Sequence, residues 1–277
     1  MRLIGLLVVL ASRVVAQQPT TDWIPTPFSE SGNPVRLEVV VYRPDGPGPF
    51  PALLFNHGST GRGNDTTLFR RTVIEPTIAR FFTERGWLVA FPQRRGRGRS
   101  GGTYAEGLAN GSGYTCDPPV SLAGLDRALQ DVDQAVQYLK RRPDVDRARL
   151  LIGGQSRGGI LSIAYAGTRR GQVLGVINFV GGWMSDQCPT HEAINTVTFR
   201  RGAAARVPTL WFYGDGDPYY RIATSRANFD AFTAAGGRGQ WVQLNPPDGS
   251  NGHQIIRTVG LWAPAVEDFL TRIKPGQ

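Results

Sequence analysis

The alternation of apolar runs with amphipathic segments constrains the fold of this 277-residue chain more than any other feature. The apolar runs are rich in branched and aromatic residues and have the length of β-strands, whereas the segments between them show helical periodicity. Such alternation is typical of an α/β fold, in which helices cover both faces of a mostly parallel central sheet. We expect strands at residues 35–42, 51–57, 87–92, 148–154, 174–181, 208–214 and 240–245.

The clearest helical pattern covers residues 121–141, where leucine and valine recur at steps of three and four and form one apolar stripe. Pro143 ends this helix. Linkers, internal repeats and low-complexity segments do not divide the chain, so residues 17–277 are predicted to form a single domain. We expect further helices near residues 69–85, 157–169, 190–205, 221–235 and 260–273.

Residues 1–16 are typical of a secretory signal peptide. Arg2 supplies the positive charge, residues 3–11 form a short apolar run, and Ala16 ends a small-residue cleavage site, although Arg13 interrupts the pattern. The run is too short to cross a membrane, and no other stretch approaches the ~20 apolar residues that a span requires. The sequence therefore predicts a secreted or periplasmic protein without stable membrane insertion.

The formal charge of +9 comes from 31 basic and 22 acidic residues, and almost all the basic residues are arginine. Such a charge admits a nucleic-acid partner, and the segment "QRRGRGRSGG" at residues 93–102 has the composition of an RNA-binding tract. RNA-binding tracts of this kind are repeated and disordered, whereas this segment is short and directly follows a predicted strand. We therefore expect a folded loop and no nucleic-acid partner.

The chain has two cysteines, Cys116 and Cys188. In an oxidising compartment they are expected to form one disulfide, and the alternative is two free thiols. The sequence has neither a C-x-x-C pair nor a cluster of histidine and cysteine, so it offers no structural metal site.

Two segments match the G-x-S-x-G pattern, residues 98–102 and residues 154–158. Nucleophilic chemistry requires this serine on a tight turn between a buried strand and a helix. Ser156 follows the apolar run "RLLIGGQ" and precedes the helical segment "RGGILSIAYAGT", whereas Ser100 lies between loop-like residues. Ser156 is therefore the predicted nucleophile, and Ser100 is not.

A serine hydroxyl needs a general base, most often histidine, and the chain has three histidines. In hydrolases with this turn, the acid and then the histidine follow the serine along the chain, which removes His57. His191 precedes the strand expected to carry the acid and is interpreted as a surface histidine, so His253 is the predicted base. For the acid, Asp217 is favoured over Asp215 because it has room to leave the strand end and reach the imidazole.

Acyl transfer also needs backbone N–H donors for the oxyanion. Arg157 supplies one of them as the residue after the nucleophile. Ser59, in "LLFNHGSTGR", supplies the other, and Gly58 lets the chain turn close to the substrate. His57 is then a packing or loop-fixing residue.

Together these motifs resemble the α/β-hydrolase superfamily, and more narrowly its dienelactone-hydrolase and prolyl-oligopeptidase-like serine hydrolases. The resemblance covers nearly all of residues 17–277, in "YRPDGPGPFPALLFNHG", "RRPDVDRARLLIGGQSRGG", "WFYGDGDP" and "GSNGH". The loop "QRRGRGRSGG" also resembles the family's loop after the fourth strand, although Gln93 replaces the usual acid. True dienelactone hydrolases use cysteine at the position of Ser156. The resemblance therefore implies an α/β-hydrolase fold and acyl transfer, but not their substrate.

We expect a carboxylic ester hydrolase that needs no cofactor and acts on a small-molecule or polymeric ester. A serine peptidase of the prolyl-oligopeptidase-like type and a non-catalytic binding protein on the same fold remain alternatives. Because the insertions are short except for residues 96–119, no large cap domain is expected and the pocket is open. A disulfide would pin the pocket rim, and the oligomeric state is not indicated. The residues expected to line the substrate pocket are Trp183, Met184, Tyr219 and Tyr220. The alternative is that these side chains only pack in the core.

Overall fold

The computed structural model describes residues 18–109 and 113–273, so the predicted signal peptide at residues 1–16 lies outside the described residues. The strands are β1 (Thr20–Glu30), β2 (Asn33–Tyr42), β3 (Phe50–Asn56), β4 (Leu88–Pro92), β5 (Leu108–Ala109), β6 (Gly113–Tyr114), β7 (Val145–Gln155), β8 (Gly175–Phe179), β9 (Pro208–Gly214) and β10 (Arg238–Leu244). The helices are α1 (Thr66–Phe69), α2 (Pro76–Thr83), α3 (Pro118–Arg141), α4 (Arg157–Thr168), α5 (His191–Ala203), α6 (Ile222–Ala234) and α7 (Val259–Arg272), with 3-10 helices η1 (Pro247–Gly249) and η2 (Gly252–Arg257).

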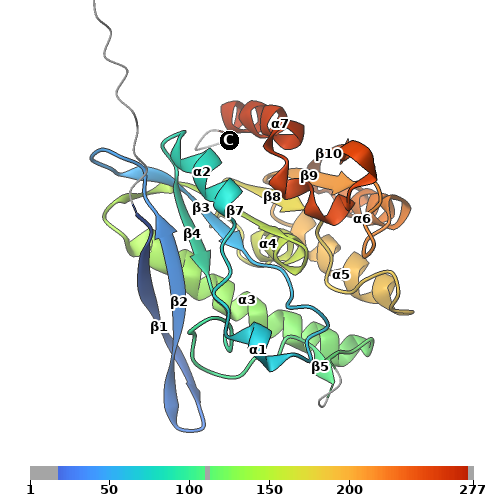
Figure 1. Ribbon diagram of the computed structural model, residues 1–277, viewed down its shortest axis with the longest axis horizontal. Coiled ribbons are helices and arrows are strands. Elements are labelled where there is room, and N and C mark those ends of the chain that lie inside the picture. Colours follow the sequence, from blue (N-terminus) through green and yellow to red (C-terminus); the bar gives the residue numbers. More distant parts are fainter. Residues whose placement is uncertain (1–17, 110–112, 274–277) are drawn as a thin grey trace, which may run out of the picture.

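The main sheet has eight strands in the order β1-β2-β4-β3-β7-β8-β9-β10 (Figure 1). Neighbouring strands from β4 to β10 are parallel, whereas β2 is antiparallel to both β1 and β4. The predicted mostly parallel sheet is therefore confirmed. Strands β5 and β6 form a separate two-stranded pair within the long loop between β4 and α3.

Strand β1 lies outside the predicted strands because its sequence contains Pro25 and Pro27. Proline lacks the N–H that a central strand donates to its neighbour, so it argues against a strand within a sheet. Strand β1 is at the sheet edge, where this loss is tolerated, and its register against β2 shifts between Pro25 and Ser29. Because of these prolines, the sequence pattern does not predict this edge strand.

The predicted helix at residues 69–85 is wrong in its first half. Helix α1 ends at Phe69 and helix α2 begins at Pro76, a residue suited to a first helical turn. The irregular segment between them is held by the side chain of Gln93, whose amide oxygen accepts from Val73 N and whose amide nitrogen donates to Val73 O, both at 2.8 Å.

Helices α3 to α6 lie on one face of the main sheet, and α2 and α7 lie on the other (Figure 1). On the second face Phe81 of α2 packs on Trp262 of α7, with ring centroids 4.7 Å apart. The loops after β3, β7, β8 and β9 leave the carboxyl ends of parallel strands, which is where open α/β sheets bind ligands. Within the described residues, none of the helices combines the length and the apolar character needed to cross a membrane.

Candidate active site

The turn at Ser156 joins β7 to α4 and holds the serine in an unusual backbone conformation. Ser156 has a φ of 56° and a ψ of −124°, a region that residues other than glycine rarely adopt. The flanking glycines are required, because a Cβ on Gly154 would lie 2.4 Å from Gly158 C and one on Gly158 would lie 2.0 Å from Asn56 O. The tight turn between strand and helix expected for Ser156 is therefore present, and its side chain lines a cavity.

Ser100, in the other G-x-S-x-G segment, has a structural position. Its hydroxyl donates to Gln93 O (2.7 Å) and accepts from Glu38 N (2.8 Å). These bonds tie the loop after β4 to strand β2, and the residues that directly follow Ser100 are irregular rather than helical. The hydroxyl of Ser100 is thus hydrogen-bonded to backbone groups, which gives it a structural role.

His253 lies in η2, and its imidazole faces the carboxylate of Asp217. The Nδ1 atom is 2.8 Å from Asp217 Oδ2, and the Asp217 side chain is fully buried. Asp217 Oδ1 accepts two backbone hydrogen bonds, from Tyr219 N (2.8 Å) and Tyr220 N (3.1 Å). Both carboxylate oxygens are therefore held, and the orientation of the imidazole is fixed by the carboxylate.

Asp215, the alternative acid, has a different partner. Its carboxylate accepts a hydrogen bond from the side-chain amide of Gln243 at 2.7 Å. The structure thus places Asp217 and not Asp215 against His253. No hydrogen bond joins Ser156 to His253 among the described residues, but both side chains line the same cavity.

The segment His57–Thr60, called here the oxyanion loop, follows β3 and approaches the predicted nucleophile. A Cβ on Gly58 would lie 3.1 Å from Ser156 Cβ, so the loop backbone passes close to that side chain. Ser59 and Arg157, the two predicted oxyanion donors, both line the same cavity as Ser156.

His57 is buried and holds the oxyanion loop. Its Nδ1 donates to Gly58 O (2.8 Å), and its Nε2 accepts from Arg94 N (3.4 Å). Burial, together with the charges of Arg94 and Arg97, holds the pKa of His57 well below its ordinary value. The imidazole therefore stays neutral and fixes the loop, as the sequence predicts.

A cavity of about 660 Å³ opens beside Ser156 and His253. Tyr219 is 48% exposed, and its ring lies edge-on to the imidazole with centroids 4.8 Å apart. Trp183, in contrast, is only 1% exposed, and its Nε1 donates to Ser121 O, so it is a buried packing residue behind the cavity surface. The cavity is lined by all the predicted substrate-binding residues, Trp183, Met184, Tyr219 and Tyr220.

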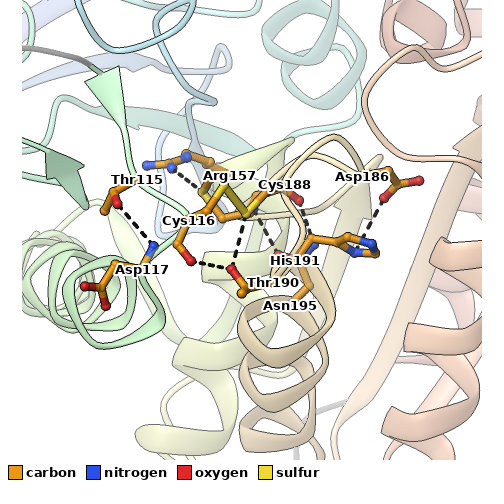
Figure 2. Close-up of a disulfide and its surroundings, with 10 residues drawn as sticks. Thr115, Cys116, Asp117, Arg157, Asp186, Cys188, Thr190, His191 and Asn195 are labelled. Carbon is orange, nitrogen blue, oxygen red and sulfur yellow. Dashed lines mark hydrogen bonds and ion pairs between the residues drawn. A yellow bond between two sulfur atoms is a disulfide. The ribbon is translucent and has the colours of Figure 1, made fainter.

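Cys116 and Cys188 form a disulfide (Figure 2), and both residues line this cavity. Their Cα atoms are 5.7 Å apart, although the residues are separated by 72 positions in the sequence. The hydroxyl of Thr190 also donates to Cys116 O. The predicted pairing is confirmed, and the bridge joins the loop before α3 to the loop before α5.

His191 is not the surface residue that the sequence predicts. Its side chain is only 12% exposed at the start of α5, and its Nδ1 lies 3.9 Å from Asp186 Oδ1 (Figure 2). Asp186 also pairs with Arg221 at 3.2 Å. The prediction fails because Asp186, in the loop before α5, lies against the imidazole, a tertiary contact without a local sequence signal.

The arginine-rich segment at residues 93–102 is a folded loop, as predicted, but three of its four arginines point inward. Arg94, Arg95 and Arg97 are between 0% and 5% exposed. The burial of these cations has no sequence signal, because a glycine-rich turn has no periodicity to show which side chains face inward. Their polar partners come from other parts of the chain: Glu106, Asp131 and Thr60.

Metal binding has no support from the described residues, in which no group of three or more His, Cys, Asp or Glu side chains is arranged to hold an ion. The cavity is lined instead by groups suited to nucleophilic acyl transfer: a serine on a strained turn and a histidine whose imidazole contacts a buried carboxylate.

The family model for phospholipases and carboxylesterases matches residues 113–254, a range that includes Ser156, Asp217 and His253. A search of curated proteins finds no significant match to the sequence. Among solved structures, Est1E from Butyrivibrio proteoclasticus with bound ferulic acid is 16% identical, with a TM-score of 0.63 over 91% of this chain and 98% of that one.

Two further esterases give similar superpositions. Acetyl xylan esterase 1 from a Thermoanaerobacterium species is 19% identical, with a TM-score of 0.59 over 92% of this chain and 88% of that one. The esterase Pf2001 from Pyrococcus furiosus is 15% identical, with a TM-score of 0.63 over 97% of this chain and 98% of that one. At these identities the likeness shows the fold, and it confirms the predicted α/β-hydrolase fold.

Proposed function

Because the chain belongs to the phospholipase/carboxylesterase family of α/β-hydrolases, we propose that it is a secreted serine esterase whose catalytic triad is Ser156, His253 and Asp217. The observation that carries the proposal is the Asp217–His253 pair, held at 2.8 Å beside the cavity that Ser156 also lines. An imidazole bound in this way through Nδ1 has its Nε2 free to accept the proton of a nucleophile.

In the acylation step, Ser156 Oγ attacks the ester carbonyl carbon while His253 Nε2 takes the hydroxyl proton. The N–H groups of Ser59 and Arg157 bind the oxyanion of the tetrahedral intermediate, and Asp217 stabilises the imidazolium. The bond to the alcohol oxygen then breaks as His253 passes its proton to that oxygen.

Deacylation repeats these steps with water as the nucleophile. His253 takes a proton from the water, the hydroxide attacks the acyl carbon, and the bond to Ser156 Oγ breaks as the proton returns to that oxygen. The acid is released and the enzyme is regenerated without a cofactor.

A small or exposed acyl group, on a small-molecule or polymeric ester, is the substrate that the cavity favours. Its volume of about 660 Å³ lies within the usual range for small-molecule pockets, and the half-exposed Tyr219 stands on its wall. Two similar folds are described by their names as binding ferulic acid and as an acetyl xylan esterase, which supports esters of small acids.

Secretion or a periplasmic location is proposed from two features. Residues 1–16 have the pattern of a signal peptide. The Cys116–Cys188 disulfide is of a kind that persists in oxidising compartments.

The test is the hydrolysis of a p-nitrophenyl ester series, from acetate to long acyl chains, by the wild-type protein and by Ser156→Ala. We expect wild-type activity that is highest on the short chains and is lost in the variant. Activity that survives in Ser156→Ala would contradict the nucleophile. A folded wild-type protein without activity on any ester would favour a peptidase or a binding protein.

A further inference from the structure

The first end of the oxyanion loop is held by Arg94. Its Nη1 donates to His57 O at 3.1 Å, and its backbone N–H donates to His57 Nε2 at 3.4 Å. Arg94 therefore fixes both the main chain and the side chain of His57, two residues before Ser59.

The other end of the oxyanion loop is held by Arg97 and Tyr114. Arg97 Nη1 donates to Thr60 Oγ1 at 2.7 Å, and Thr60 N donates to the Tyr114 hydroxyl at 3.3 Å. The backbone of Ser59, the expected oxyanion donor, thus lies between two points that are fixed by side chains from elsewhere in the chain.

Both ends connect to one buried carboxylate, that of Glu106. Arg94 binds both of its oxygens, through Nε and through Nη2, the second at 3.1 Å. The Tyr114 hydroxyl hydrogen-bonds the Tyr104 hydroxyl at 2.6 Å, and Tyr104 donates to Glu106 Oε2 at 3.0 Å. Even the residue after Ser156 joins this network, because Arg157 Nη1 donates to Glu106 O at 2.6 Å. The network therefore connects the two backbone segments that supply the oxyanion donors.

Arg97 is an expensive residue to bury in this way. Its side chain is fully buried, and its Nε and Nη2 atoms have no hydrogen-bond partner among the described residues. The guanidinium lies 5.3 Å from the Tyr104 ring centroid, and that contact offsets only part of the desolvation. A cation so placed does little for stability, which favours a role in function.

We propose that Arg97 and Arg94 are positioning residues for the oxyanion loop, which they clamp at Thr60 and His57 so that the Ser59 N–H meets the tetrahedral oxygen. This inference rests on the proposed esterase function. It gives the arginine-rich loop a role in transition-state stabilisation that depends on geometry, since an oxyanion donor acts only within hydrogen-bond distance of the developing charge.

The experiment compares the wild-type enzyme with Arg97→Met, Arg97→Lys and Thr60→Val. The readouts are kcat and KM for p-nitrophenyl acetate, and inhibition by phenylboronic acid, which bonds to the serine as a tetrahedral anion. We expect Arg97→Met to lower kcat about 10- to 100-fold with little change in KM. The affinity for the boronic acid should fall in parallel, and the pH dependence of the rate should not move, because His253 is untouched. Arg97→Lys should recover part of the loss.

Thr60→Val removes the acceptor hydroxyl but leaves the arginine, so it should act in the same direction with a smaller effect. Thr60→Val also tests the contact between Arg97 and Thr60 if Arg97→Met does not fold. Where both variants fold, the double variant should be no worse than Arg97→Met alone, because the two changes break one interaction. The matched control is Arg99→Gln in the same loop, whose arginine side chain is 59% exposed and pairs with Glu38 rather than with the oxyanion loop. This control should keep wild-type kcat.

Two results separate this proposal from the proposed function. Wild-type esterase activity that Ser156→Ala removes, combined with unchanged kcat and boronate affinity in Arg97→Met and Thr60→Val, overturns the positioning role alone. Variants that melt at a lower temperature but keep wild-type kcat and boronate affinity also overturn the positioning role, because they show that the contact serves stability alone. A folded wild-type enzyme that hydrolyses no ester overturns the proposed function, and the positioning role with it.

Discussion

Replacement of Asp217 by asparagine tests the assignment of the acid most directly. Asp217 accepts three hydrogen bonds, from His253 Nδ1 (2.8 Å), Tyr219 N (2.8 Å) and Tyr220 N (3.1 Å). The oxygen of asparagine can keep the two backbone donors, but its NH₂ group then faces Nδ1, which must become an acceptor. The imidazole proton moves to Nε2, which can no longer take the proton of Ser156.

The same exchange of tautomer in a serine protease lowers kcat about 10⁴-fold, and we expect a loss of that order here. It corresponds to about 5.5 kcal/mol of transition-state stabilisation. The assay is kcat on p-nitrophenyl acetate, with a thermal melt to show that Asp217→Asn is folded. The control is Asp215→Asn, because Asp215 contacts Gln243 rather than the histidine, and less than about a twofold loss is expected. A folded Asp217→Asn enzyme within tenfold of wild type, or an equal loss in Asp215→Asn, would refute the reasoning.

Two further predictions concern stability. The pKa of the buried His57 lies well below its ordinary value, so the unfolded chain takes up a proton below about pH 6.5 that the folded protein does not. His57 should therefore lower the free energy of unfolding by about 1.36 kcal/mol per pH unit as the pH falls below that value. Urea unfolding at several pH values gives the free energy of unfolding as a function of pH, and this dependence should be weaker for His57→Gln than for the wild-type protein. An equal pH dependence in the two proteins would contradict this role of His57. Loss of the Cys116–Cys188 bridge, which spans 72 positions, should lower the free energy of unfolding by about 2–4 kcal/mol. The measurement is urea unfolding of the double Cys→Ser variant in non-reducing buffer, and an unchanged midpoint would count against a stabilising bridge.

The parts of the site that depend on local backbone geometry could be predicted from the sequence. The turn at Ser156 follows from glycines whose Cβ atoms would overlap backbone atoms, and such a requirement is visible in the residues themselves. Strand β9 has the predicted bounds, residues 208–214, because a buried parallel strand is a continuous apolar run. The meeting of Asp217 with His253 was predictable because chain order on this fold fixes which loops meet.

The parts that depend on tertiary partners could not be predicted. Strand β1 contains prolines, and only its place at the sheet edge makes them acceptable. His191 is covered because Asp186 lies beside it, in a loop without periodicity. The irregular segment between α1 and α2 is held by Gln93, a residue that directly follows strand β4.

The arginine-rich loop shows how composition can mislead about surface charge. The three inward arginines count toward the formal charge of +9, yet they add little to the basic character of the surface because they are buried. Their charge is offset internally: Glu106 and Asp131 lie beside them, and burial raises the pKa of Asp131 to about 6 despite the neighbouring Arg95. Arg157 is held in another way, between the rings of Tyr114 and Trp183, whose centroids lie 3.5 Å and 4.1 Å from its guanidinium carbon. These cations therefore act on the interior beside the cavity rather than on a partner at the surface, and two of them, Arg94 and Arg97, contact the oxyanion loop directly.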